Sequence, residues 1–511
     1  MPINSLFSYF IKKRLDQIDF FKRYPHETQR EVFHGLIRAA RFTEWGKEND
    51  YKSIDNLKTF KDRIPVQRYE DLKPYVDRLK KGEQNLLWPT DIKWFAKSSG
   101  TTNDKSKYIP VSREALEECH FKGGKDLVGL HCHMRPKTRI YTGRSLVVGG
   151  SRQVNEFRTD SYSGDLSAIV IKNLPLWVEI RQTPDRAVAL MDGWEEKIEQ
   201  MARITMRDNV KNIVGVPSWT LVLLRRILDI SGADNINEIW PDLELYIHGG
   251  VSFRPYKEQF RSLIPDPAMN YLDSYNASEG FFGVQDIEGS DEMLLMLDYG
   301  IFYEFMLMSE LGKEHPETLE LSEVQVGVNY AIIISTNAGL WRYLIGDTIV
   351  FTSTDPYRIQ VSGRTKHFIN AFGEELIIDN AEKALEVACE RSGALISDYT
   401  AAPIFMDHKA KGGHEWLIEF EKEPEDRRFF TGSLDNALKS LNSDYEAKRT
   451  GDLSLGMPVV RSMPSGTFQE WLKSKGKLGG QHKVPRLSND RTVVDDIMAR
   501  SFVKDVTDAL V

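Results

Sequence analysis

A short polar stretch early in the chain has the composition of a phosphate-binding loop. Its hydroxyl and backbone N–H groups can donate to phosphate oxygens, its glycine lets the backbone approach closely, and Lys107 adds a mobile positive charge. The stretch comprises Ser98, Ser99, Gly100, Thr101 and Thr102. It lacks the Gly-x4-Gly-Lys-Ser/Thr spacing of a Walker loop. An ordinary polar surface loop is the alternative interpretation of the same residues.

Two later motifs carry carboxylates that suit a nucleotide and its metal ion. In YNASEG, Glu279 lies beside small residues and could hold a Mg²⁺ ion that bridges phosphates, while Tyr275 could stack on a base. In WRYLIGD, Asp347 directly precedes an apolar strand and could accept hydrogen bonds from two ribose hydroxyls. The alternatives are a solvated Glu279 with a core Tyr275, and an ion pair between Arg342 and Asp347.

The elements expected around these motifs belong to an α/β fold. Up to about residue 350, apolar strands alternate with helices, such as the strand over 144–151 and the helix over 219–231. Ligands of such folds bind at the carboxyl ends of strands. Each of the three motifs follows or interrupts an apolar strand, so we expect them to line one crevice. The chain contains no Gly-x-Ser-x-Gly, His-Glu-x-x-His or Gly-x-Gly-x-x-Gly motif that would favour a hydrolase or a Rossmann dinucleotide site.

A second, smaller unit is expected at the end of the chain. The composition changes near Gly363, and the helices and strands expected beyond it suffice for an α+β domain of about 140–150 residues. We therefore divide the chain into domains over 1–362 and 363–511, with a hinge near 360–370. Several glycines precede Lys483, which would let domain closure deliver this lysine to an active site.

Composition excludes several other classes of protein. The chain has 511 residues, which predicts two or three domains, and its net charge of -8 argues against a general affinity for nucleic acid. Its three cysteines show no Cys-x-x-Cys spacing, which favours a reducing compartment. No signal peptide is visible, and no apolar run approaches the ~20 residues that span a bilayer. We expect a cytoplasmic monomer or weak homodimer that binds neither nucleic acid nor membrane.

In their order and spacing, the three motifs resemble those of the auxin-responsive Gretchen Hagen 3 family. These proteins are acyl-acid amido synthetases within the adenylate-forming superfamily. The resemblance continues through GRTKHFINAFGEELIIDNAE and QHKVPRLSND, so it covers nearly the whole chain. The residues within the motifs resemble those of the bacterial branch of the family. One departure is Asn103-Asp104, which stands where the wider superfamily has glycines and adds a negative charge near the phosphates.

The resemblance implies a large N-terminal α/β domain of the acyl-adenylate-forming type and a small, mobile α+β C-terminal domain. It also implies the ligands, which are ATP, Mg²⁺, a carboxylic acid and an amino acid. By this resemblance, Glu279 would hold Mg²⁺, Asp347 would bind the ribose with Arg364 as a second contact, and Lys483 would reach the α-phosphate. Ser278 would contact the nucleotide, and Tyr275 would pack beside the adenine. The residues implied to bind the ATP phosphates are Ser98, Ser99, Gly100, Thr101, Thr102 and Lys107.

The implied reaction joins the acid to the amino acid in two steps. A carboxylate is a poor electrophile, so it is first converted with ATP into an acyl-adenylate, and an amine then attacks the acyl carbon. An acyl-CoA ligase-like enzyme with a thiol acceptor is the alternative. A nucleotide-sensing or scaffolding protein that has lost turnover is a third interpretation. The combined presence of Glu279, Asp347 and Lys483 argues against that third interpretation.

The acid-binding pocket is the part of the site that the sequence defines least. Two connections lie where strand ends could form an apolar pocket, and Trp219 would suit an aromatic acid. Their candidate residues are Val216, Trp219, Gly249 and Gly250. Ordinary core packing is equally compatible with all four.

Overall fold

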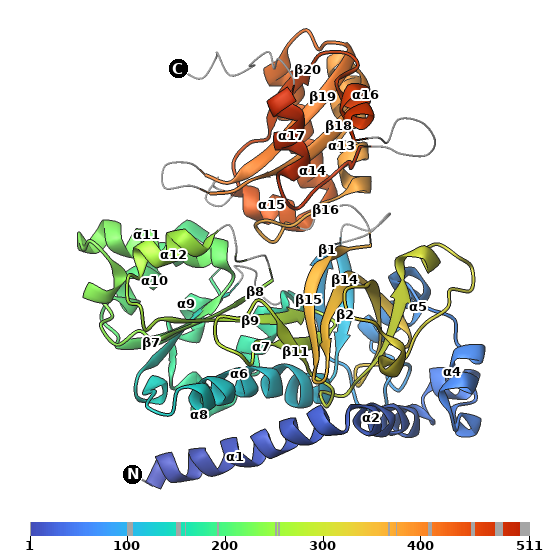
Figure 1. Ribbon diagram of the computed structural model, residues 1–511, viewed down its shortest axis with the longest axis vertical. Coiled ribbons are helices and arrows are strands. Elements are labelled where there is room, and N and C mark those ends of the chain that lie inside the picture. The colour runs from blue at the N-terminus through green and yellow to red at the C-terminus, as the bar shows by residue number, and fades with distance from the viewer. Residues whose placement is uncertain are drawn as a thin grey trace.

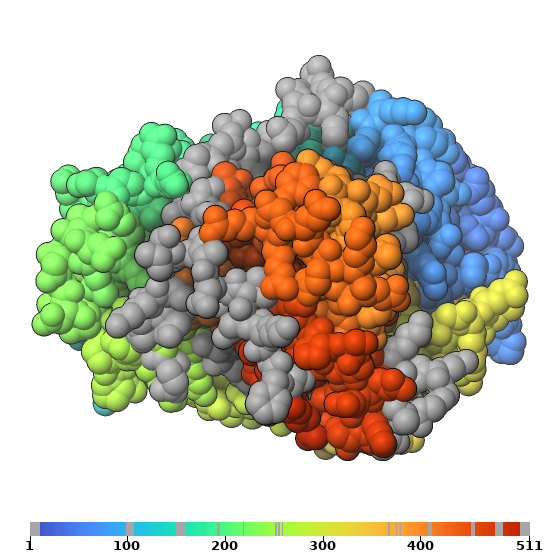
Figure 2. All heavy atoms as spheres, turned by 90° about the horizontal axis from the view of Figure 1, so that it is seen from above, coloured from blue at the N-terminus to red at the C-terminus, as the bar shows by residue number. Residues whose placement is uncertain are grey.

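The fold was obtained as a computed structural model and consists of a large N-terminal part with a smaller C-terminal part stacked above it (Figure 1). The structure describes residues 2–99, 106–149, 155–158, 160–191, 194–250, 253, 256–365, 368–374, 376–406, 411–450, 455–475 and 484–500. Seen from above, the C-terminal elements cover the middle of the N-terminal part (Figure 2).

The N-terminal part is built around a twisted sheet of eleven strands. In sheet order these are β12 (Ile301–Leu307), β13 (Asn329–Thr336), β14 (Tyr343–Thr354), β15 (Tyr357–Arg364), β11 (Met293–Leu295), β10 (Gly280–Val284), β9 (Asn270–Ala277), β8 (Leu245–Gly249), β7 (Val210–Gly215), β3 (Arg144–Val148) and β6 (Gln182–Thr183). The strands from β9 to β6 are parallel, whereas those from β9 to β12 are antiparallel. The expected alternation of strand and helix therefore describes only one half of the sheet.

A second sheet has the order β2-β1-β5-β4. Its strands are β1 (Trp94–Ser99), β2 (Ser106–Val111), β5 (Ser161–Gly164) and β4 (Asn155–Arg158). Strands β1 and β2 pair in antiparallel fashion, with Ser98 opposite Lys107. The start of the expected phosphate-binding loop is therefore the end of a strand, and the segment over 100–105 lies outside the described residues.

Helices cover the N-terminal part on two sides. The first helices are α1 (Pro2–Arg23) and α2 (Pro25–Ala40), and α2 begins with a proline, which favours the first turn because of its fixed φ. Below the sheet, α1 is held against α6 (Phe121–Met134) by Arg14, which pairs with Asp126 and Asp298 (Figure 1). A lobe beside the parallel strands contains α10 (Trp194–Thr205), α11 (Pro217–Ser231) and α12 (Lys257–Leu263) (Figure 1). The remaining α-helices of this part are α3 (Glu44–Glu48), α4 (Leu57–Arg63), α5 (Tyr69–Lys80), α7 (Leu166–Lys172), α8 (Leu176–Glu179) and α9 (Arg186–Ala189).

The C-terminal part contains a three-stranded sheet, a small strand pair and five helices among the described residues. The sheet consists of β18 (Leu395–Ile404), β19 (Gly413–Lys422) and β20 (Val459–Met463), and the pair of β16 (Phe368–Ile369) and β17 (Leu376–Ile377). The helices are α13 (Ile378–Ser392), α14 (Arg427–Leu441), α15 (Ser443–Arg449), α16 (Thr467–Ser474) and α17 (Thr492–Arg500). Our division of the chain near residue 363 remains a proposal.

Buried contacts join the C-terminal part to the α11–α12 lobe. The Tyr256 hydroxyl donates to the backbone oxygen of Ala371 at 2.8 Å, and Gln259 Nε2 donates to that of Met406 at 2.6 Å. A single cluster of buried apolar side chains extends through both regions. The smaller part is therefore packed on the larger one rather than merely tethered to it. None of the described helices is long and apolar enough to cross a membrane.

Candidate active site

A crevice of about 1620 Å³ lies among the β1–β2 hairpin, the main sheet, the α11–α12 lobe and the C-terminal part. Residues from all three sequence motifs line it, together with much of the expected acid pocket. The predicted residues on its wall are Ser98, Lys107, Val216, Trp219, Gly250, Tyr275, Ser278, Glu279, Asp347 and Arg364. The expectation that the motifs share one crevice is met by these positions, whereas the role of each residue stays a prediction.

The other predicted site residues are placed differently. Gly249 ends β8, and an added Cβ there would come within 2.4 Å of the Ser274 backbone oxygen, so this glycine permits close packing of β8 on β9. It is not among the described residues that line the crevice, although the neighbouring Gly250 is. The side chain of Ser99 lies outside the described part of the chain. So do Gly100, Thr101, Thr102 and Lys483.

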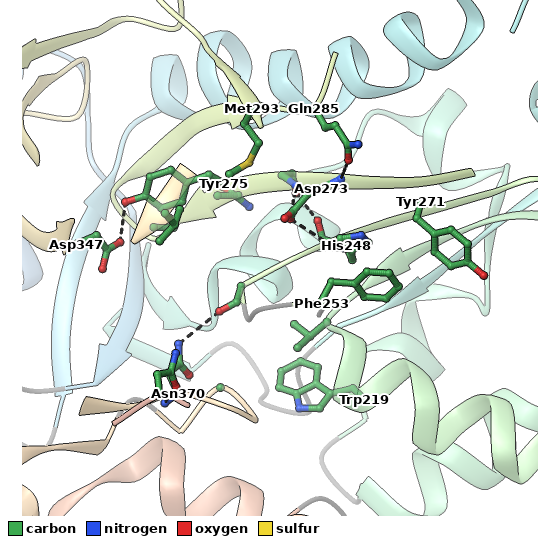
Figure 3. A pocket seen from close by; sticks show the side chains of 18 of the residues that line it. Trp219, His248, Phe253, Tyr271, Asp273, Tyr275, Gln285, Met293, Asp347 and Asn370 are labelled. Atoms are coloured by element: carbon green, nitrogen blue, oxygen red, sulfur yellow. Dashed lines mark hydrogen bonds and ion pairs between the residues drawn. The ribbon is translucent and has the colours of Figure 1, made fainter. Parts of the chain in front are cut away.

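Asp347 has a fixed orientation in the crevice wall. It lies within β14, opposite Arg364 on β15, and is 6% exposed. Its Oδ1 lies 2.7 Å from Arg364 Nε, and its Oδ2 accepts a 2.7 Å hydrogen bond from the Tyr275 hydroxyl (Figure 3). A carboxylate offers about four acceptor positions, so these two contacts leave acceptor capacity toward the crevice.

The alternative ion pair between Arg342 and Asp347 is wrong. Arg342 turns to the opposite face and pairs with Glu304 at 2.8 Å, with side chains 4% and 1% exposed. It also donates to the Thr318 hydroxyl and to the backbone oxygens of Lys61 and Ile64, at the end of α4. The expectation that Asp347 precedes its strand is also wrong, because β14 already begins at Tyr343.

Tyr275, on β9, holds Asp347 in place through the hydrogen bond that its hydroxyl donates. Its ring is buried and packs on Phe282, with centroids 4.8 Å apart. Burial, followed by the negative charge of Asp347, raises the pKa of the Tyr275 hydroxyl well above its ordinary value. The hydroxyl therefore stays protonated and donates to the carboxylate. This role was not foreseen from the sequence, because 72 positions separate the two residues.

Glu279 lies at the tip of the β9–β10 hairpin. Ser278 and Glu279 form the turn, so the expected strand followed by a polar loop is a hairpin. Behind it, His120 Nδ1 lies 3.1 Å from the side-chain oxygen of Asn276. Burial lowers the pKa of His120 to about 4, so the ring is neutral at physiological pH and can donate to Asn276. The hairpin thus presents one carboxylate and one hydroxyl to the crevice.

The residues at the end of the β1–β2 hairpin face the same crevice. Ser98 and Lys107 are paired across the two strands, and both contribute to its wall. The Lys107 ammonium lies 6.0 Å from the centre of the Tyr69 ring. A hydroxyl and a cation held side by side are suited to an anionic group. No cluster of three or more His, Cys, Asp or Glu suited to a metal ion occurs among the described residues.

Docking of the C-terminal part adds crevice residues that the sequence did not predict. The Lys448 ammonium of α15 lies 3.9 Å from the centre of the Trp219 ring, a cation–π contact across the two parts. Asn370 donates to the Gly250 backbone oxygen at 3.4 Å (Figure 3). No sequence motif around Lys448 indicates a site residue, because this lysine reaches the crevice only through the packing of the two parts.

The sequence matches three consecutive domain patterns. Residues 14–269 match the GH3 family N-terminal domain, residues 294–364 the GH3 family central domain, and residues 379–492 the GH3 family C-terminal domain. The chain belongs to the GH3 family. This result confirms the resemblance drawn from the motifs. The β9–β10 hairpin and Asn370 lie in the intervals between the matched ranges.

Several GH3 proteins are similar along almost their full length. The indole-3-acetic acid-amido synthetase GH3.3 of Arabidopsis thaliana is 23% identical over 555 residues, which cover 93% of this chain and 90% of that protein. The jasmonoyl–L-amino acid synthetase JAR4 of Nicotiana attenuata is 24% identical over 550 residues, covering 92% of each. These relatives are plant proteins and do not bear on our expectation of a bacterial-type GH3 member.

Solved structures confirm the predicted fold class. The acyl acid amido synthetase AtGH3.15 in complex with 2,4-DB superposes with a TM-score of 0.63 at 17% identity, covering 96% of each chain. A 2-hydroxyisobutyryl-CoA ligase superposes with a TM-score of 0.56 at 12% identity, covering 93% of this chain and 92% of that one. This GH3 chain therefore has their fold, with a large N-terminal α/β domain and a smaller C-terminal domain.

Proposed function

We propose that the protein is an ATP-dependent acyl-acid amido synthetase. It converts a carboxylic acid and ATP into an acyl-adenylate and pyrophosphate, and then transfers the acyl group to the amine of an amino acid. The observation that carries this proposal is the single crevice lined by Ser98, Glu279 and Asp347, which are far apart in the sequence. Membership of the GH3 family and the names of the similar amido synthetases support the same reaction.

The crevice wall suits ATP as the first substrate. Asp347, held by Tyr275 and Arg364, accepts hydrogen bonds from the ribose hydroxyls. Ser98 and Lys107 contact the phosphates together with the segment that follows β1, and Tyr275 marks the side on which the adenine lies. This arrangement fixes the nucleotide so that the α-phosphate faces the acid. Positioning and charge stabilisation then carry most of the catalysis.

Glu279 is the protein ligand proposed for Mg²⁺. Mg²⁺ is commonly bound by one or two carboxylates together with substrate phosphates and water, so a single carboxylate at the hairpin tip fits this ion. When bound, the ion would neutralise charge on the phosphates during displacement of pyrophosphate. Ser278 lies beside it in the same turn and contacts the nucleotide.

The C-terminal domain, residues 363–511, acts as a lid in this proposal. Its Lys483 brings a positive charge to the α-phosphate during adenylation, and rotation about the hinge near 360–370 prepares the crevice for the amine. The hydrogen bonds from Tyr256 and Gln259 to this domain support a lid that docks on the large domain. We place the enzyme in the cytoplasm as a monomer or weak homodimer, with neither nucleic acid nor membrane as a partner.

The acid binds at the end of the crevice bounded by Val216, Trp219 and Gly250. Phe253 also lines this end, so two aromatic rings are available to an apolar or aromatic acid. Gly249 lets β8 run close to β9 beside this end, because an added Cβ there would lie 2.4 Å from the Ser274 backbone oxygen.

Acid-dependent exchange of pyrophosphate into ATP tests the proposal. A panel of aliphatic and aromatic carboxylic acids is screened first, and the best acid is then incubated with ATP and either the amino acids or coenzyme A. The proposal predicts exchange with at least one acid and an N-acyl amino acid detected by mass spectrometry. Exchange with no acid would contradict adenylation, and a thioester without any amide would establish the thiol acceptor instead.

A further inference from the structure

His248 is a buried imidazole on the crevice wall that the proposed nucleotide contacts do not use. It lies near the carboxyl end of β8 and is only 4% exposed. Its ring stacks on Phe253, with centroids 4.0 Å apart and an angle of 20° between the planes (Figure 3). Among the described residues of the crevice wall it is the sole imidazole.

A carboxylate lies beside one nitrogen of this ring. His248 and Asp273 are paired across the parallel strands β8 and β9, and His248 Nδ1 lies 3.4 Å from Asp273 Oδ1 (Figure 3). The Nδ1 atom is buried and makes no hydrogen bond. Buried polar atoms are nearly always satisfied, and catalytic hydrogen bonds are often long before substrate binds.

Asp273 is itself held in place. Its carboxylate accepts a hydrogen bond from the Ser274 backbone N–H at 2.8 Å, and its own backbone N–H donates to Gln285 Oε1 at 2.7 Å. A fixed carboxylate beside Nδ1 stabilises the imidazolium that forms when the other ring nitrogen takes up a proton. The geometry is therefore that of a base with an orienting partner.

The second step of the proposed reaction needs such a base. When a neutral amine attacks the acyl-adenylate, a C–N bond forms, the bond between the acyl carbon and the phosphate oxygen breaks, and AMP leaves with the electron pair. The nitrogen must lose one proton to give the amide. Imidazole is the side chain best suited to accept a proton near neutral pH.

We infer that His248, oriented by Asp273, takes this proton from the attacking amine and later releases it to water. The inference rests on the proposed function and extends it to the transfer step. His248 directly precedes the Gly249-Gly250 turn, at the end of the crevice that holds the acid, and the Asn370 contact brings the C-terminal domain to the same turn. The negative charge of Asp273 also favours an amino group over a second carboxylate at this place.

The test separates the two half-reactions in His248→Asn, Asp273→Asn and a control, His315→Asn, which changes an exposed histidine distant in sequence from every crevice motif. Pyrophosphate exchange measures adenylation. Capture of the acyl group is measured once with the amino acid and once with hydroxylamine. Hydroxylamine is weakly basic, so its adduct loses the proton to water without help from the enzyme.

The inference predicts that His248→Asn keeps exchange and hydroxamate formation, while amide formation falls by roughly 10²- to 10⁴-fold, the usual contribution of a general base. Amide formation should also fall in Asp273→Asn, and the control variant should form amide as fast as the unsubstituted protein. Retained exchange also shows that the variant is folded.

Three results would overturn it. They are unchanged amide formation in His248→Asn, an equal loss of hydroxamate and amide, or a loss of exchange, which would make His248 a residue of acid binding or of packing. An unsubstituted protein without acid-dependent exchange would instead contradict the proposed function, and this inference with it.

Discussion

Replacing Asp347 by Asn is the most informative single perturbation of the proposed nucleotide site. The side chain keeps its size but loses its charge, and Tyr275 and Arg364 remain beside it. Because the Arg364 side chain is 25% exposed, water can solvate the guanidinium that no longer has a charged partner. We therefore expect a folded protein whose defect is confined to nucleotide binding.

The size of the defect follows from the hydrogen bonds that the carboxylate makes to the ribose. Two of its roughly four acceptor positions are used within the protein, which leaves about two for the ribose hydroxyls. A hydrogen bond to a charged group contributes about 1.5–3 kcal/mol. Two such bonds contribute about 3–6 kcal/mol, so at about 1.4 kcal/mol per factor of ten kcat/KM for ATP should fall by roughly 10²- to 10⁴-fold.

The assay compares ATP with 2′-deoxyATP and 3′-deoxyATP in acid-dependent pyrophosphate exchange. The unsubstituted protein should prefer ATP over both analogues, and Asp347→Asn should lose that preference, because the partner of the missing hydroxyl is already gone. If the variant kept the full preference for ATP, the assignment of Asp347 to the ribose would be refuted.

A matched control is available just beyond the end of β10. Asp286 is a buried carboxylate that pairs with Arg358 and Lys22, and it does not belong to the described crevice wall. Asp286→Asn should lower the free energy of unfolding without changing kcat/KM for ATP or for either analogue. A change in nucleotide preference in this control would show that the assay reports stability rather than binding.

Three further outcomes are expected. Lys483→Ala should lower adenylation by roughly 10²- to 10³-fold, the usual effect of removing a charge-stabilising donor, and a near-normal exchange rate would contradict its role. Glu304→Ala should lower the free energy of unfolding in urea by about 3–5 kcal/mol, because Arg342 would stay buried without its partner, and a decrease below about 1 kcal/mol would contradict that reasoning. Gly339→Ala should lower the free energy of unfolding more than Gly327→Ala does. Both glycines have positive φ, but only at Gly339 would a Cβ lie 2.6 Å from a buried leucine. Equal decreases in the two variants would show that the core adjusts to the added atom.

The sequence predicted the fold class and the grouping of the motifs from local signals. A helix depends on residues that are neighbours in the sequence, so the helix expected over 219–231 is present as α11, which begins two residues earlier at Pro217. The sequence predicts a single helix from about Asp426 to Arg449, whereas the structure has the two helices α14 and α15 there. Asn442 caps α15 with its side chain there, a signal that the sequence does contain.

The antiparallel half of the sheet could not be predicted in the same way. Pairing of β14 with β15 and of β9 with β10 decides that Asp347 meets Arg364 and that Glu279 lies at a hairpin tip. These pairings depend on which strands become neighbours in space. The pairing of His248 with Asp273 depends in the same way on β8 and β9 lying side by side.

The most direct test of the shared crevice is a crystal structure of the protein with a non-hydrolysable acyl-sulfamoyl adenosine. A shared crevice predicts ribose hydroxyls within hydrogen-bonding distance of Asp347, the sulfamoyl group between Ser98 and Glu279, and the acyl chain toward Trp219. An adenosine bound away from Asp347, or an acyl chain that leaves the crevice on another side, would contradict it.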